Sequence, residues 1–351
     1  MKILIIQQKM IGDVLTSSIL FDNLKREYPK SELHYLINSN TYPVVINHPN
    51  IDHFIFFTPE IKNSNQLFFK LCKKIKLEHY DTVIDVYGKW SSNFISYSSK
   101  AKIRISYYKW YTSFFYTHPI KRRKTSKQNL GLAIEHRLQL LEPICSINTQ
   151  IKPKIYLTEE EITNAKNFLE EAEIQLKKPL FMISVLGSGN TKTYPYKYMA
   201  QIIDQIVIQT NGQILFNYIP SQETAAKEIF NKCTLASQSK IYFNVFGRSL
   251  REFIAITKHC NALIGNEGGA INMAKAVDIP TFAIFSPWIS KESWNLYEDD
   301  KEHMSVHLKD FYPEIYADKL QKQLKPKIEE LYLKFKSELF KEKLERFLEQ
   351  F

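Results

Sequence analysis

The chain has 351 residues, 44% of them hydrophobic and 24% charged, which is typical of a soluble globular protein long enough for two domains. No apolar run approaches the roughly 20 residues of a membrane-spanning helix. Met1 and Lys2 precede only four apolar residues, so we predict no signal peptide and a cytoplasmic location. The net charge of +10 favours an anionic partner but does not choose among nucleotide phosphate, nucleic acid and a membrane surface.

The cysteines and histidines show no metal-binding spacing. Cys72, Cys145, Cys233 and Cys260 are scattered without a C-x-x-C pair, and the nine histidines form no H-E-x-x-H. We therefore predict free thiols, and we expect neither disulfides nor a structural metal.

The N-terminus reads as a βαβ unit. A strand over 2–6 is followed by a loop with Gly12, an amphipathic helix over 13–28 and a second strand over 32–37. This order places Asp13 at the carboxyl edge of a parallel sheet, where ligands of doubly wound folds bind. From the residues alone, a helix cap is the better explanation of Asp13, because Asp is common at helix starts.

The alternation of strands and helices continues to about residue 141. We predict strands over 51–57, 81–86 and 102–106 and helices over 66–77, 93–99 and 130–141. Asp85 lies near the end of the strand over 81–86 and Gly88 follows it, which is typical of a strand end and its turn.

Aromatic residues alternate with positive charge between residues 107 and 127. The basic side chains include Lys121, Arg122 and Arg123. Three interpretations stay open, namely single-stranded nucleic acid binding by stacking, contact with an anionic glycolipid or membrane surface, and a solvated loop beside a packed strand.

A linker over 144–153 precedes a second α/β half. The helix over 159–176 has a capping box of Thr158 and Glu161. The remaining elements are predicted strands over 180–186, 212–219, 242–246, 262–264 and 281–285, and helices that begin after Pro195, Pro220, Ser249 and Gly269.

Two loops of the second half have phosphate-binding chemistry. The first contains Gly187, Ser188, Gly189, Thr191 and Lys192, which offer backbone N–H groups, hydroxyls and one ammonium. It lacks the Walker spacing, which disfavours an NTPase. The second contains Glu267, Gly268 and Gly269 before a helix; it is suited to a phosphate, although a plain tight turn explains the glycines as well.

These segments resemble glycosyltransferase family 9, the bacterial lipopolysaccharide heptosyltransferases. The matching features are Gly12-Asp13-Val14 near the N-terminus, Tyr80-Asp81 before the strand that ends at Asp85, Lys192-Thr-Tyr-Pro195, and the stretch 264–287 with its Ile-Pro and Phe-Ser-Pro. Glu267, Gly268 and Asn272 depart from the family's Asp-Ser/Thr-Gly-x-x-His pattern.

The resemblance implies an α/β, GT-B-like fold with two Rossmann-like doubly wound domains facing a central cleft. The expected parts are an acceptor domain over 1–153, a donor domain over 154–312 and a helical segment over 313–351 whose apolar stripe packs back on the first domain. Heptosyl transfer from ADP-heptose to a lipopolysaccharide core acceptor, the anionic lipid A–Kdo glycolipid, is the implied reaction. It would take place in the cytoplasm, with peripheral contact to the inner membrane face, and without cofactor, metal or nucleic acid.

The resemblance also assigns roles to particular residues. Asp13 is the implied catalytic base. The implied donor-binding residues are Gly187, Ser188, Gly189, Thr191, Lys192, Glu223, Glu267, Gly268, Gly269 and Asn272, and those for the acceptor are Gly12, Asp85, Lys121, Arg122 and Arg123. The alternatives are transfer from another nucleotide sugar to a surface glycan, and a nucleic-acid-binding protein that uses residues 107–127. A nicotinamide enzyme is disfavoured because no G-x-G-x-x-G follows the first strand.

Overall fold

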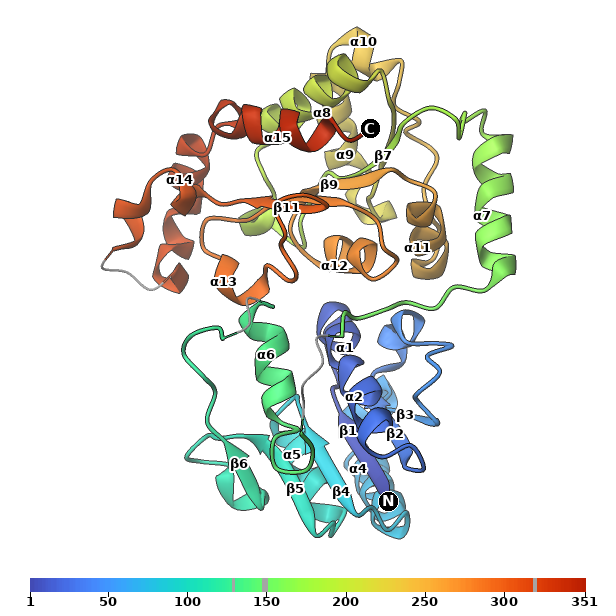
Figure 1. Cartoon of the computed structure of the whole chain (residues 1–351), viewed down its shortest axis with the longest axis vertical. Coiled ribbons are helices and arrows are strands. Elements are labelled where there is room, and N and C mark those ends of the chain that lie inside the picture. Colours follow the sequence, from blue (N-terminus) through green and yellow to red (C-terminus); the bar gives the residue numbers. More distant parts are fainter. Residues whose placement is uncertain (128–129, 147–150, 318–320) are drawn as a thin grey trace. The chain divides into compact units, whose positions relative to one another are not determined.

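The protein consists of two compact units, Met1–Tyr156 and Leu157–Phe351 (Figure 1). The computed structural model describes residues 1–127, 130–146, 151–317 and 321–351. The boundary between the units lies three residues beyond the predicted one. No helix within these ranges is long and apolar enough to cross a membrane.

The first unit alternates strands and helices. Its elements are β1 (Lys2–Ile6), α1 (Ile11–Ser17), α2 (Ile19–Glu27), β2 (Glu32–Ile37), β3 (His53–Phe56), α3 (Pro59–Asn63), α4 (Asn65–Leu77), β4 (Thr82–Asp85), α5 (Trp90–Ser98), β5 (Ile103–Tyr107), β6 (His118–Ile120) and α6 (Leu132–Gln139). The strands form one parallel sheet in the order β3-β2-β1-β4-β5-β6. This is the doubly wound arrangement, in which the order of the strands across the sheet reverses between β1 and β4.

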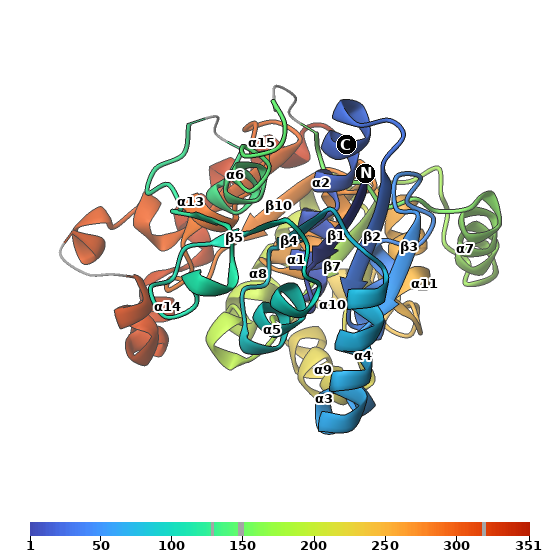
Figure 2. The ribbon, with the colours of Figure 1, turned by 90° about the horizontal axis from the view of Figure 1, so that it is seen from below.

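Helices cover both faces of this sheet. In Figure 2, α4 and α5 lie on one face and α2 and α6 on the other. Leu4 and Ile6 of β1 join Leu36, Ile75 and Val83 in a buried cluster on the α4 side. Since both faces are buried, the strands are almost continuously apolar, and this makes them visible in the sequence.

Two details of the first unit differ from the prediction. The helix expected over 13–28 is divided at Ser18 into α1 and α2. Ser17 and Ser18 donate to the carbonyls of Asp13 and Leu15, at 2.7 and 2.8 Å, a local competition that disfavours a straight helix. Strand β6 was missed because it has three residues and contains Pro119, which is tolerated at a sheet edge.

The second unit has the same organisation. Its elements are α7 (Glu159–Glu171), β7 (Leu180–Ser184), α8 (Tyr196–Thr210), β8 (Gln213–Phe216), α9 (Glu223–Lys232), α10 (Leu235–Gln238), α11 (Leu250–Lys258), β9 (Ala262–Asn266), α12 (Gly269–Lys275), β10 (Thr281–Ile284), α13 (Lys291–Trp294), β11 (His303–Val306), α14 (Ile328–Lys334) and α15 (Lys341–Leu348). The predicted capping box is present, since the Thr158 and Glu161 side chains each accept from the other's backbone N–H.

The second sheet is parallel in the order β11-β10-β9-β7-β8. The prediction of a strand over 242–246 is wrong, because this segment does not join the sheet as a strand. Only Ile241 pairs with the sheet, through a single bridge to Ile214. The Val245 N–H bonds to the Tyr242 carbonyl at 3.0 Å, and this turn takes the backbone away from the edge of β8 before a ladder can form.

The C-terminal segment packs on the second unit, which corrects the expectation that it docks on the first. Its apolar residues, including Phe335, Phe340 and Phe347, belong to the same buried cluster as Tyr194 and Phe282. The ring centroids of Phe282 and Phe347 are 5.6 Å apart, and α15 runs beside α8 (Figure 1). An amphipathic stripe predicts that a face is buried but does not identify the surface that buries it.

Candidate functional site

In the first unit, Asp13 is held by an arginine that lies 124 residues away in the sequence. Arg137 Nη2 donates to Asp13 Oδ1 at 2.6 Å, and its Nε and Nη1 donate to Ser17 Oγ at 2.9 Å and to the Ala133 carbonyl at 2.6 Å. The Arg137 side chain is 7% exposed and that of Asp13 26%. The guanidinium is therefore fixed from three sides and orients one carboxylate oxygen of Asp13.

The second oxygen of this carboxylate remains available. Among the described residues, no donor hydrogen-bonds to Asp13 Oδ2. Asp13 follows β1, next to the point where the strand order reverses. A carboxylate with one oxygen fixed and the other open at this edge has the arrangement of a general base. Gly12 precedes it, and the Gly12 carbonyl accepts from Thr16 Oγ1 at 2.8 Å.

Asp85, a predicted acceptor residue, lies in the interior of the first unit. Its side chain is fully buried, and it accepts from the Gly88 N–H at 2.8 Å and contacts the Tyr116 hydroxyl at 2.6 Å. Burial raises the pKa of this carboxyl group. Asp85 thus fixes the turn after β4 from inside, and its side chain is not exposed at the surface.

The segment 86–134 is strongly basic. It contains ten Lys and Arg residues and no Asp or Glu, so its formal charge equals the net charge of +10 of the whole chain. Large aromatic side chains stand out from the same segment, and Trp110 is 80% and Phe114 67% exposed. This combination is typical of a surface that meets anionic head groups at a membrane interface.

The three predicted acceptor cations of this segment have different surroundings. The Arg122 guanidinium lies 3.8 Å from the centre of the Tyr107 ring, and Lys121 Nζ lies 5.4 Å from that of Tyr108. Arg123 forms an ion pair with Glu142, which neutralises much of its charge. Arg122 and Lys121 are therefore the better candidates for an anionic acceptor.

In the second unit, the fold brings the two predicted phosphate loops together. The loop with Lys192 follows β7 and the loop with Glu267 follows β9, and these adjacent strands flank the reversal of strand order. Ser286 Oγ and Trp288 Nε1 both donate to the Thr191 carbonyl, at 2.7 and 2.9 Å. The first loop is thus tied to the end of β10 as well.

Lys192 and Glu267 form the polar centre of this site. Lys192 Nζ lies 3.2 Å from Glu267 Oε1. The two groups form an ion pair, but their geometry is not that of a hydrogen bond. That oxygen is buried and has no hydrogen-bond donor among the described residues. Buried acceptors are almost always satisfied, so an unsatisfied carboxylate oxygen beside an ammonium indicates a place for ligand hydroxyl and phosphate groups.

Glycines shape the backbone around this centre for different reasons. A Cβ on Gly187 would lie 2.3 Å from the Lys192 carbonyl, so only glycine allows the loop to fold on itself. Gly268 has φ +147° with open space beside it, a conformation that other residues avoid. Ser188 and Gly189 are exposed at the tip of the loop.

The helix after this turn is shorter than expected. Gly269 begins α12, which has only seven residues, so a helix dipole contributes little here. Asn272 is half-buried on α12, and its side chain has no hydrogen-bond partner among the described residues. Glu223 is exposed at the start of α9. Its neighbour Gln222 reaches the loop instead, and its Nε2 donates to the Gly187 carbonyl at 3.3 Å.

Sequence reasoning missed several residues that organise the site. They are Arg137, Gln222, Asn266 and Trp288. The Asn266 side chain donates to the Ser184 carbonyl and accepts from the Tyr194 N–H, at 2.8 and 2.7 Å. Lys192 and Lys325 lie 5.8 and 4.9 Å from the Trp288 ring centre. Of these four residues, only Asn266 could have been noticed in the sequence, because it is a polar residue at the end of an apolar strand.

Comparisons with known proteins identify the family and the fold. A family model described as glycosyltransferase family 9 (heptosyltransferase) matches residues 68–323. The lipooligosaccharide heptosyltransferase 2 of Haemophilus influenzae is 23% identical over 302 residues, covering 82% of this chain and 84% of the relative.

Solved structures share the fold. A glycosyl transferase family 9 protein from Veillonella parvula has a TM-score of 0.76 at 17% identity, with 95% of this chain and 97% of that chain covered. The E. coli heptosyltransferase WaaC with ADP has a TM-score of 0.64 at 14% identity, with 95% and 99% covered.

Proposed function

This chain belongs to glycosyltransferase family 9, and we propose that it transfers a heptose from ADP-heptose to an anionic inner-core glycolipid. The chain is a glycosyltransferase with two doubly wound α/β units. The donor, the acceptor and the residue roles below are parts of the proposal. The relative solved with ADP supports an adenine nucleotide, and the relative that acts on lipooligosaccharide supports the acceptor class.

The Lys192–Glu267 pair is the observation that carries the proposal. When the donor enters, the Lys192 ammonium leaves the Glu267 carboxylate and binds the diphosphate. Glu267 Oε1 then accepts a hydrogen bond from a hydroxyl group of the sugar or ribose. Each charged group then has a partner that fits it better than the ion pair of the free protein, which lacks hydrogen-bond geometry. The backbone N–H groups around Gly187 and Gly268 add further donors for the phosphates.

In the proposed reaction, Asp13 Oδ2 takes the proton of the acceptor hydroxyl. The acceptor oxygen forms a bond to the anomeric carbon from the face opposite the diphosphate. The bond between that carbon and the diphosphate oxygen breaks, and the electron pair leaves with ADP. The configuration is inverted, and Lys192 stabilises the negative charge that develops on the leaving group.

Nucleotide binding to the full chain tests the donor half of the proposal. We expect calorimetry to show binding of ADP in preference to UDP, GDP and NADH. Lys192→Ala should weaken ADP at least about tenfold, because a charge-assisted contact contributes roughly 1.5–3 kcal/mol. Lys197→Ala, at an exposed lysine five residues further on, is the matched control and should bind as the wild type does.

Each other result leads to a definite revision. A preference for UDP or GDP would keep glycosyl transfer and remove heptose. Selective NADH binding would revive the nicotinamide alternative. Equal loss in Lys192→Ala and Lys197→Ala would show that Lys192 acts only as a surface charge.

We further propose that the 86–134 segment places the enzyme on the inner membrane face, where its acceptor lies. The basic charge and the exposed rings of Trp110 and Phe114 support this part. Trp110→Ser should reduce co-sedimentation with anionic vesicles, whereas Leu235→Ser, at a residue of the second unit that is 84% exposed, should not. Salt-sensitive binding to a single-stranded oligonucleotide without vesicle binding would favour the nucleic-acid alternative.

A further inference from the structure

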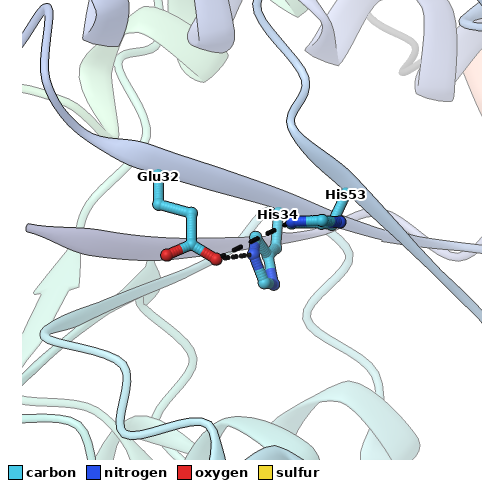
Figure 3. Close-up of side chains that lie close together, drawn as sticks. All are labelled: Glu32, His34 and His53. Atoms are coloured by element: carbon cyan, nitrogen blue, oxygen red, sulfur yellow. Dashed lines mark hydrogen bonds and ion pairs between the residues drawn. The ribbon is translucent and has the colours of Figure 1, made fainter.

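Two histidines and a glutamate meet at the amino end of the first sheet, at the opposite edge from Asp13. Glu32 and His34 are two residues apart on β2 and therefore project to the same face. His53, the first residue of β3, is the register partner of His34. The backbone register alone thus brings the three side chains together, as Figure 3 shows.

The potential ligand atoms of these side chains lie within reach of one ion. One ligand atom from each residue lies within 4.8 Å of those of the other two. His34 Nε2 is 2.7 Å and His53 Nε2 is 3.9 Å from Glu32 Oε1. Tetrahedral zinc with bonds of about 2.0–2.1 Å keeps its ligands roughly 3.4 Å apart, so small rotations of the exposed Glu32 and His53 side chains suffice.

His34 is oriented as a ligand by a buried tyrosine. The His34 side chain is 6% exposed, and its Nδ1 lies 2.7 Å from the Tyr80 hydroxyl. In the tautomer with the proton on Nδ1, this proton is donated to Tyr80 and the lone pair of Nε2 points toward Glu32. Such a hydrogen bond on the far nitrogen is the usual support of a metal-binding histidine.

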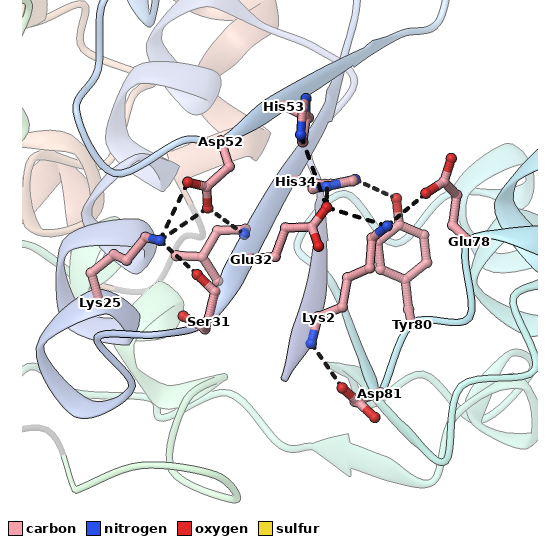
Figure 4. Close-up of polar contacts among 11 residues, drawn as sticks. Lys2, Lys25, Ser31, Glu32, His34, Asp52, His53, Glu78, Tyr80 and Asp81 are labelled. Atoms are coloured by element: carbon pink, nitrogen blue, oxygen red, sulfur yellow. Dashed lines mark hydrogen bonds and ion pairs between the residues drawn. The ribbon is translucent and has the colours of Figure 1, made fainter.

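The surrounding charges include one competitor. Lys2 Nζ lies 3.3 Å from Glu32 Oε1 and 2.7 Å from Glu78 Oε2 (Figure 4). A cation at Glu32 would displace Lys2 from this oxygen, and Lys2 would keep its shorter contact with Glu78. Asp81 accepts a hydrogen bond from the Lys2 backbone N–H at 2.7 Å. Three carboxylates, those of Glu32, Glu78 and Asp81, therefore contact Lys2, which has one ammonium group.

We propose that Glu32, His34 and His53 form a divalent transition-metal site, of which zinc is the expected occupant. Two imidazoles and one carboxylate are a known zinc ligand set that leaves a fourth position for water. The ion would join the edge strand β3 to β2. It lies at the amino end of the sheet, whereas Asp13 follows the carboxyl end of β1.

Zinc binding to tag-free, chelator-treated full-length protein tests this proposal. We expect one zinc per chain in competition with a chromophoric chelator, and a cobalt derivative with the visible absorption of tetrahedral coordination. Glu32→Gln and His53→Gln should each weaken zinc at least about tenfold. His118→Gln, at an exposed histidine of the same unit, is the matched control. Lys2→Met should strengthen binding, because it removes the competing ammonium.

The outcomes separate this proposal from general surface binding and from the proposed function. Absence of stoichiometric zinc in the wild type, or equal affinity in Glu32→Gln and His53→Gln, would overturn it. So would a loss in His118→Gln as large as that in His53→Gln. Both ligand variants alter exposed side chains, and ADP binding measured on the same samples reports on the donor site independently.

Discussion

The ion pair between Asp13 and Arg137 gives the sharpest prediction. Asp13→Asn keeps the shape of the side chain but leaves the Arg137 guanidinium, which is 7% exposed, without its charge partner. Breaking a buried pair by removing one member costs about 3–5 kcal/mol, whereas exposed pairs contribute about 0–1 kcal/mol. Because Asp13 is 26% exposed, we expect a loss of unfolding free energy of about 1–3 kcal/mol.

Arg137→Met removes the other charge and keeps the apolar stem. If the two groups stabilise each other, the double variant should be less destabilised than the sum of the single variants, by about 1–2 kcal/mol. Urea unfolding of the full chain measures this coupling free energy. If the chain unfolds in more than one step, the step whose midpoint changes in Asp13→Asn is compared in all variants. Arg123 and Glu142, whose side chains are 32% and 46% exposed, supply a control pair with a coupling of at most about 1 kcal/mol.

Turnover separates the structural role of this pair from its chemical role. Asp13→Asn should lower turnover by about 10²–10⁴, the usual contribution of a general base, and leave ADP affinity unchanged. Arg137→Met should lower turnover less, since it misplaces the carboxylate without removing it. Near-normal turnover in Asp13→Asn would refute the assignment of the base, and zero coupling would refute the importance of the ion pair.

Three further predictions concern the framework of the site. Gly265→Ala should destabilise by more than about 2 kcal/mol, because φ is +128° and a Cβ would lie 2.5 Å from a strand carbonyl; Gly189→Ala, with nothing within 4 Å, should change urea midpoints little. Burial raises the pKa of Asp85, so its contribution to stability is full below the ordinary carboxyl pKa and is lost as the pH rises through the raised value. Asp85→Asn should therefore gain stability relative to the wild type as the pH rises above about 4, the ordinary carboxyl pKa, and a parallel pH profile would contradict this. Tyr194→Phe should cost about 1–3 kcal/mol by thermal or urea unfolding, since the buried hydroxyl donates to the Phe335 carbonyl at 2.6 Å; an unchanged midpoint would mean that water satisfies the carbonyl.

Much of the fold could be predicted because its information is local. Parallel strands buried on both faces are short apolar runs, and the glycines and caps between them are separate local features. The predicted runs 2–6 and 32–37 therefore coincide with strands, and the run predicted over 180–186 contains β7. Segments with a weaker local pattern were misjudged, as at 242–246 and in the short strand β6.

The sequence by itself determined the two α/β halves, the loops after their first strands, and the residue types that meet phosphate. Only the tertiary structure decided which distant side chains meet. It pairs Arg137 with Asp13, buries Asp85 in the first unit, and packs the C-terminal apolar stripe on the second unit. These outcomes depend on strand order, register and helix placement. Many separate sequence positions combine to set these features, so no single local pattern contains them.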